Sequence, residues 1–202
     1  MTAPDLSRIV LDASLDLIKE RGLGALSMRE VARRAGVSHQ APYHHFHDRE
    51  GILAAIAKEG FERLHAAMRR AAEARTDPVE RLNAIGEAYV TFAAHHPAHF
   101  KIMFRSELVA TEQHEHLHAQ ADAAFEFVTS VVRAAVESSG AIAVDDPMPY
   151  VIAAWSMVHG ASTLLLEGKL DHHFGASATK RLHGALAAIR TYGELLRREP
   201  PR

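Results

Sequence analysis

The chain has 202 residues, 23 Lys and Arg against 25 Asp and Glu, and no cysteine. This length allows one large domain or a small domain joined to a larger one. The near balance of charge excludes a generally basic nucleic-acid coat, so any DNA binding must be local, and the lack of cysteine excludes disulfides, thiolate metal sites and cysteine nucleophiles. The N-terminus lacks a signal-peptide pattern and no apolar run reaches membrane length, so we expect a soluble cytoplasmic protein that binds no membrane.

The first predicted helices lie in the N-terminal quarter of the chain. An apolar stripe that includes Ile9, Ala13 and Leu17 predicts the first of them. The segment 27–46, SMREVARRAGVSHQAPYHHF, then predicts two short helices joined by a glycine turn. Ser27 and Glu30 have the spacing of a capping box, in which each side chain binds a free backbone N–H of the other residue.

The end of the second helix and the start of the third also have recognisable signals. Gly36 is expected to end the second helix in a left-handed conformation, which glycine adopts without steric cost. The third helix is expected to span 39–46, with Ser38 as its N-cap and Pro42 at about its fourth position. Asp48 is expected to cap the long helix that follows.

This arrangement is typical of a helix-turn-helix, whose second helix enters the major groove of DNA. Corners of this kind can also serve packing alone, but here the caps, the glycine and the polar and aromatic cluster agree. His39, Gln40 and Ala41 could face base edges, and the second turn of the helix could donate to phosphates. The local surplus of positive charge is small, which favours a dimer that doubles the number of phosphate contacts.

The segment from about Leu6 to Ile56 resembles the DNA-binding domain of the TetR family of bacterial repressors. The phrase LSMREVARRAGVS, and YHHF followed by DRE, carry this resemblance. It implies an all-α protein with a three-helix DNA-binding domain over 1–50 and a larger effector-binding and dimerisation domain over 51–202. Pro42 and Arg49 depart from the usual aliphatic residue and lysine of the family, so the resemblance does not give the operator sequence.

Together the resemblance and the helix pattern predict a set of DNA-contacting residues. In this set Arg49, like His45, is expected to hold a backbone phosphate. The full predicted set is Arg29, Ser38, His39, Gln40, Ala41, Tyr43, His44, His45 and Arg49.

The rest of the chain predicts helices and no strand. Their expected ranges are about 48–75, 78–96, a short aromatic helix from 97, 115–138, 149–167 and 176–198. The helix over 149–167 is apolar almost all round, which is typical of a helix buried on several sides. We expect the last two helices to pair with their copies in a homodimer, where TetR-like proteins dimerise. The phrase WSMVHG in the first of them also resembles a C-terminal subtype of the family with a Trp-x-x-x-His-Gly signature.

Aromatic side chains and methionine in this region are candidates for the lining of an effector cavity. The same residues at helical spacing could equally form an ordinary core, and the cavity is implied mainly by the resemblance. The candidates are Phe92, Phe100, Met103, Phe104, Phe125, Phe127 and Trp155, with His159 as a polar anchor.

Fifteen histidines raise the alternative of a metal-responsive regulator. They cluster at 95, 96 and 99, at 114, 116 and 118, and at 172 and 173. A closed zinc site needs about four ligands, and no H-E-x-x-H pattern is present. Most of these histidines are therefore expected to be solvated, and we predict no metal and no cofactor.

No Gly-rich phosphate loop, nucleophile elbow or paired-carboxylate pattern is present, so we predict no enzyme and no catalytic residues, with a helical enzyme as the weakest alternative. The sequence thus predicts a homodimeric repressor that binds a palindromic operator in double-stranded DNA. A small apolar effector of unknown identity is expected to release it.

Overall fold

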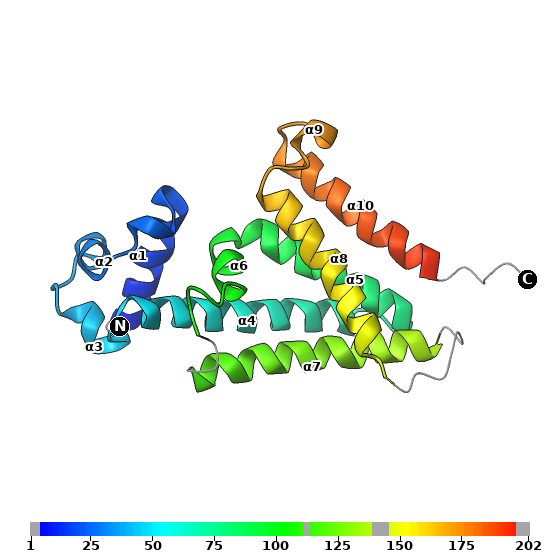
Figure 1. Ribbon diagram of the computed structural model, residues 1–202, viewed down its shortest axis with the longest axis horizontal. Helices are drawn as coiled ribbons and strands as arrows, with labels where there is room; N and C mark the ends of the chain where they lie inside the picture. The colour runs from blue at the N-terminus through cyan, green and yellow to red at the C-terminus, as the bar shows by residue number, and fades with distance from the viewer. Residues whose placement is uncertain (1–4, 111–113, 139–145, 197–202) are drawn as a thin grey trace, which may run out of the picture. The chain divides into compact units, whose positions relative to one another are not determined.

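The computed structural model describes residues 5–110, 114–138 and 146–196, apart from the side chains at 192, 193, 195 and 196 (Figure 1). Every regular element in these ranges is a helix, which confirms the all-α prediction. The elements are α1 (Leu6–Arg21), the 3-10 helix η1 (Leu23–Ala25), α2 (Met28–Ala35), α3 (Ala41–Phe46), α4 (Arg49–Glu73), α5 (Pro78–His95), α6 (Pro97–Met103), α7 (Glu115–Ser138), α8 (Met148–Leu166), α9 (Asp171–Phe174) and α10 (Ala178–Leu196).

The chain forms two compact units. The first contains Met1–Phe61 and Ala98–Ala121, and the second contains Glu62–Pro97 and Asp122–Arg202. The helices α4 and α7 each contribute residues to both units. In addition to α1, α2 and α3, the first unit therefore holds the first part of α4, most of α6 and the start of α7. The sequence placed the domain boundary at residue 50.

Local signals in the first unit determine where α2 begins and ends. The Ser27 side chain accepts a hydrogen bond from the Glu30 backbone N–H at 3.3 Å, which confirms the predicted N-cap. The Glu30 carboxylate does not reach back to the cap; it binds the guanidinium groups of Arg33 and Arg21 instead. Gly36 ends α2 at φ 68°, in the left-handed conformation expected of it.

The start of α3 differs from the prediction. Residues 39 and 40 form a turn, and α3 begins at Ala41, whose N–H binds the Ser38 carbonyl oxygen at 3.0 Å. Gln40 occupies the N-cap position without a side-chain cap bond, so the prediction of Ser38 as N-cap is wrong. Pro42 then lies in the first turn of α3, where its missing N–H has no intrahelical partner to lose. The preference of proline for this position explains the later start of the helix.

The corner between α3 and α4 is tight. His47 has φ 58°, which is uncommon for a residue other than glycine. Asp48 caps α4 by accepting a hydrogen bond from the Gly51 N–H at 2.8 Å, as predicted. A Cβ at Gly51 would overlap the carbonyl oxygen of Phe46 and lie 3.0 Å from its carbonyl carbon. Only glycine therefore lets the end of α3 approach the first turn of α4 this closely.

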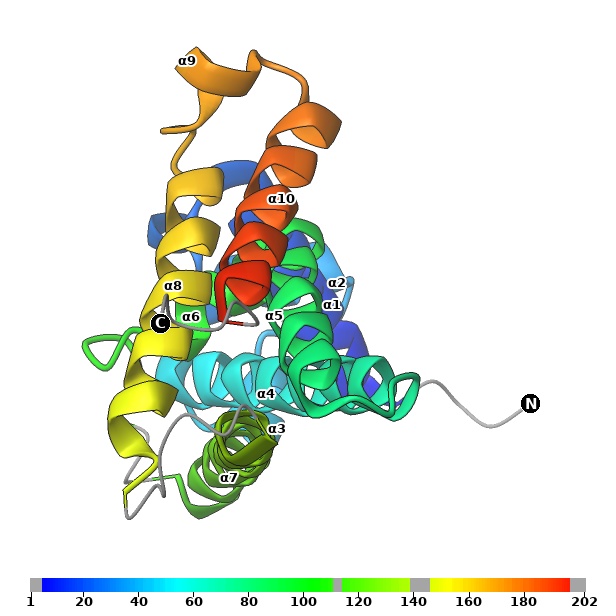
Figure 2. The same cartoon turned by 90° about the vertical axis from the view of Figure 1, so that its right-hand side faces the viewer.

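In the second unit α5 packs against both α8 and α10, which also contact each other (Figure 2). Asp77 caps α5 by accepting a hydrogen bond from the Glu80 N–H at 2.8 Å, and the helix begins at Pro78, the start predicted for it. Gly86 faces the other two helices: a Cβ there would lie 3.0 Å from Ile189 and 3.4 Å from Val158. The absence of a side chain at Gly86 allows the three helices to approach closely.

The predicted helices of the body are confirmed, with ends that differ by a few residues. The sequence missed α9, which lies in the connection between α8 and α10, because a single helical turn carries no periodic apolar signal. Among the described residues, one helix, α8, is long and apolar enough to cross a membrane. A single helix of this kind is weak evidence for a span, since the core helices of soluble proteins have the same length and composition.

Candidate functional site

A polar and aromatic surface surrounds the corner between α2 and α3. Most of the predicted DNA-contacting side chains lie exposed on it, and the His39 and Tyr43 rings are 5.7 Å apart. Tyr43 is 39 % exposed, so its ring and hydroxyl are accessible to a binding partner. The exposed members of the predicted set are Arg29, Ser38, His39, Gln40, Tyr43, His44 and His45.

Two residues of the predicted set have structural roles instead. Ala41, the first residue of α3, is buried, with 6 % of its surface exposed. The Arg49 guanidinium donates to the carbonyl oxygens of Leu26 and Leu23, at 3.0 and 3.1 Å, and so ties the start of α4 to the segment before α2. We therefore leave Ala41 and Arg49 out of the DNA-contacting set proposed below.

The cations of α2 are largely neutralised by acids of the same unit. Arg33 binds Glu30 at 2.7 Å, and Arg34 binds Glu20. The Arg33 guanidinium lowers the pKa of the Glu30 carboxyl to about 2, so this acid stays charged in any neutral buffer. The surface around α3 thus has little surplus charge to offer phosphates, and one copy would bind DNA only moderately.

The predicted effector-binding residues fall into two groups. Phe100, Met103 and Phe104 lie in the first unit around α6, where Phe104 contacts Phe61 and Phe100 with ring centroids 5.5 and 5.2 Å apart. Phe100 and Met103 are buried there, as in an ordinary core. The members in the second unit are Phe92, Phe125, Phe127, Trp155 and His159.

In the second unit, Trp155 and His159 of the Trp-x-x-x-His-Gly signature bind one tyrosine hydroxyl. The Trp155 indole N–H donates to the Tyr89 hydroxyl at 3.3 Å, and that hydroxyl lies 2.9 Å from His159 Nδ1. The indole N–H can only donate, so the Tyr89 oxygen accepts from Trp155. The Tyr89 hydroxyl then donates its proton to Nδ1 of a neutral His159. Phe125 contacts Trp155 edge to face, with ring centroids 6.1 Å apart. The signature therefore joins α8 to α5 through Tyr89.

Burial shifts the titration of both groups in this hydrogen bond. It raises the pKa of Tyr89 and lowers the pKa of His159 below the ordinary 6.5. Near neutral pH both side chains are therefore uncharged, as the hydrogen bond between them requires.

We expect the free energy of unfolding to fall as the pH is lowered from 7 to about 5, in part because of His159. The unfolded chain binds a proton at His159 near the ordinary pKa of 6.5, whereas the folded protein resists it. The free energy of unfolding therefore falls as the pH drops through 6.5, and this loss stops growing once the pH is below the folded pKa. Urea unfolding across this range should show a shallower pH dependence for His159→Gln than for the unchanged protein. Parallel curves would contradict this role of His159.

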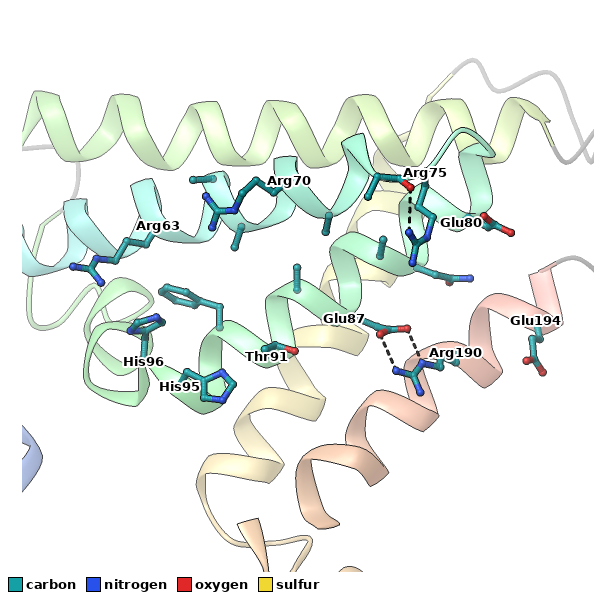
Figure 3. Close-up of a pocket in the computed structure, with 18 residues that line it drawn as sticks. Arg63, Arg70, Arg75, Glu80, Glu87, Thr91, His95, His96, Arg190 and Glu194 are labelled. Atoms are coloured by element: carbon teal, nitrogen blue, oxygen red, sulfur yellow. Dashed lines mark hydrogen bonds and ion pairs between the residues drawn. The ribbon is translucent and has the colours of Figure 1, made fainter. Parts of the chain in front are cut away.

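A groove of about 810 Å³ lies in the second unit, between α4 and α5 and beside α10 (Figure 3). Alanines from α4 and α5 line much of it, and Phe92 adds an aromatic wall beside His96. Among the predicted effector-binding residues, this groove includes Phe92 and none of the others. Its charged and polar lining, which sequence reasoning missed, consists of Arg63, Arg70, Arg75, Glu80, Asn83, Glu87, Thr91, His95, His96, Arg190 and Glu194.

A second groove, of about 640 Å³, lies in the first unit between the α3–α4 corner and the start of α7. It brings together His45, His47, His114 and His116, and His114 Nε2 lies 3.5 Å from Glu50 Oε1. Within the described ranges, no three histidine or acidic side chains are grouped as a metal site would require. The geometry gives the metal-responsive alternative no support.

Comparisons with known proteins cover most of the chain. Residues 10–56 match the family described as bacterial regulatory proteins, tetR family, and residues 82–189 match the tetracyclin repressor-like C-terminal domain. The transcriptional activator FasR of Mycolicibacterium smegmatis is 31 % identical over 123 residues, which are 61 % of this chain and 55 % of FasR. The regulator BetI of Burkholderia cenocepacia is 38 % identical over 77 residues, 38 % of this chain and 40 % of BetI. The chain thus matches about half the length of these relatives or less.

Solved structures resemble the whole chain. A protein of unknown function from Rhodococcus sp. RHA1 is 30 % identical, with a TM-score of 0.76 and 98 % of each chain covered. The TetR-family regulator PfmR of Thermus thermophilus is 26 % identical, with a TM-score of 0.69 and 100 % and 99 % covered. FadR of Bacillus subtilis, solved with stearoyl-CoA, shares the fold at 17 % identity, with a TM-score of 0.71 and 94 % and 96 % covered.

The C-terminal family match alone spans more than half of the 202 residues, and the N-terminal match contains the whole helix-turn-helix. The chain therefore belongs to the TetR family of DNA-binding transcriptional regulators.

Proposed function

We propose that this protein is a homodimeric repressor, which binds a palindromic operator through α3 and the turn before it and is released by a small-molecule effector. The exposed cluster around α3 carries this proposal. Tyr43 on α3 and His39 and Gln40 in the turn before it present polar groups at the surface, next to the capped helix α2 and the left-handed Gly36. Such a helix fits the major groove, where side-chain donors and acceptors read base edges.

The dimer interface is proposed to lie on α8 and α10. Val151 and Val158 are buried side chains of α8, and α8 contacts α5 and α10 within the second unit. Other apolar side chains of the same helix are well exposed, with Ile152 at 53 % and Leu164 at 45 %. Tyr150 and Trp155 are exposed as well, at 40 % and 39 %. Several large exposed apolar residues on one helix indicate a protein interface, and a twofold axis would bury them against the same surface of a second copy.

The effector is proposed to act by shifting a population of two states. Operator binding by a dimer requires its two recognition helices to be about one duplex turn apart, roughly 34–36 Å. A ligand that prefers another spacing weakens DNA binding by its difference in affinity for the two states, typically about 1–3 kcal/mol.

Selection from a random-sequence duplex library with the purified protein tests the DNA-binding part of this proposal. We expect an inverted repeat, with half-site centres about 10 base pairs or a multiple of that apart. An enriched single half-site would contradict the dimeric mode, and a lack of any enrichment would contradict operator recognition.

We expect Ile152→Glu to abolish the dimer and, with it, tight operator binding. The twofold axis would bury a new carboxylate from each copy without a partner, at a cost of several kcal/mol. Analytical ultracentrifugation should show a monomer, and thermal unfolding should show that it is still folded. Ala119→Glu places the same charge at an exposed position on α7 and should leave the dimer intact. A dimeric Ile152→Glu protein with unchanged operator affinity would overturn the interface.

A further inference from the structure

The groove between α4 and α5 has a lining of two chemical kinds. Small side chains from the two facing helices leave the space open and make its base apolar: Ala66, Ala67, Ala71, Ala74, Ala84 and Ala88. Charged side chains surround this base, and they come from α4, α5, α10 and, for Arg75, the connection between α4 and α5. The volume of about 810 Å³ lies in the range of small-molecule sites, about 300–1,000 Å³.

The charges around the groove are unevenly placed. Figure 3 shows Arg63, Arg70, His95 and His96 toward one end, and the three glutamates of the lining toward the other. At the acidic end Arg190 is held by Glu87 through two hydrogen bonds, of 2.7 and 2.9 Å. The arginines outnumber the glutamates by four to three.

This distribution favours a ligand with one acidic end. A guanidinium group presents a planar fork of donors that matches a carboxylate or phosphate, and a concave cationic surface concentrates the field that attracts an anion. An ion without an apolar part would leave the alanine base and Phe92 uncovered. A purely apolar ligand, which the sequence predicted as the effector, would desolvate the charged groups of the lining without offering them a hydrogen-bond acceptor of its own.

We propose that this groove binds an amphipathic organic anion. Its carboxylate or phosphate head lies at Arg63, Arg70, His95 and His96, and its aliphatic body lies along the alanines of α4 and α5. The site stands on the groove alone. Its role as the effector site rests on the proposed function, because a ligand in the α4–α5 groove changes operator binding only if a small molecule releases the protein from its operator.

Isothermal titration calorimetry of the full chain without DNA tests the site directly. The probes are decanoate, decyl phosphate, inorganic phosphate and decyltrimethylammonium, each below its micellar concentration. We expect the two amphipathic anions to bind at micromolar concentrations, inorganic phosphate at least tenfold more weakly, and the cation not at all. Affinity for the anions should fall with added salt, because the contact is ionic. Equal binding of the cation, or of inorganic phosphate, would overturn the proposal.

Neighbouring arginines on α4 provide a matched pair of variants. Arg70 and Arg69 are both exposed, but Arg70 lines the groove, whereas Arg69 does not and pairs with Glu73 at 3.3 Å. We expect Arg70→Gln to weaken decanoate binding at least tenfold and Arg69→Gln to leave it within twofold. Equal affinities for the two variants would contradict the placement of the acidic head.

A third variant and a DNA measurement separate the site from its regulatory role. Ala67→Leu should fill the base of the groove and block the aliphatic body, with the melting temperature as a check that the chain folds. Saturating decanoate should lower operator affinity at least fivefold in the unchanged protein and not in Ala67→Leu. Binding without this change in operator affinity would overturn the effector role. If the unchanged protein bound no operator even without a ligand, that result would instead count against the proposed function.

Discussion

Replacing Gly51 with alanine is expected to disrupt the α3–α4 corner and abolish operator binding. The new Cβ would overlap the Phe46 carbonyl oxygen, and this neighbour is backbone that cannot rotate away as a side chain can. The same carbonyl oxygen accepts a hydrogen bond from the Asp48 N–H at 2.6 Å, so moving it also disturbs the cap of α4. Overpacking of this kind costs about 1–3 kcal/mol, and a fixed backbone neighbour favours the upper part of that range.

Urea unfolding, circular dichroism and operator binding measure this effect. Gly24→Ala is the matched control, because it adds the same methyl group to the same unit where a Cβ meets nothing within 4 Å. We expect the control to change the free energy of unfolding by less than about 0.5 kcal/mol. If Gly51→Ala were as stable as Gly24→Ala and bound DNA equally well, the close approach of α3 and α4 would not exist in solution.

The parts of the fold that depend on neighbouring residues could be predicted from the sequence. The caps at Ser27, Asp48 and Asp77 and the left-handed Gly36 are each determined by a few adjacent residues. Amphipathic periodicity located the long helices for the same reason. The start of α3 was wrong because two local signals competed: Ser38 favoured an early start, and Pro42 favoured its own place in the first turn.

Features that depend on how helices pack against one another could not be predicted. The sequence assigned a phosphate to Arg49, but its guanidinium binds carbonyl oxygens 23 and 26 residues earlier. Nothing near Tyr89 in the sequence indicates its role, because the two partners of its hydroxyl lie 66 and 70 residues further along the chain. Alanines of α4 and α5 indicate only helix in the sequence. That they line a groove follows from where the two helices face each other.

We expect Tyr43→Ala to lower the affinity of the dimer for its operator by about 30- to 100-fold. The side chain is exposed on α3 and lies next to His39, so its truncation should leave the fold intact. A hydrogen bond from the hydroxyl to the DNA contributes about 1–1.5 kcal/mol in each subunit. Because the twofold dimer loses this contact twice, the total is about 2–3 kcal/mol, and each 1.4 kcal/mol corresponds to a factor of ten.

Fluorescence anisotropy with the selected operator at several salt concentrations separates this contact from bulk electrostatics. Tyrosine is neutral, so Tyr43→Ala should lower affinity without changing the dependence on salt, whereas loss of a phosphate-binding cation reduces that slope by about one unit for each contact. Tyr43→Phe keeps the ring and should recover the part of the affinity that does not come from the hydroxyl. Lys19→Ala removes an exposed cation of α1 in the same unit and should change affinity less than twofold. If Tyr43→Ala bound as tightly as Lys19→Ala, α3 would not be the helix that contacts DNA, and the surface around it would need another partner.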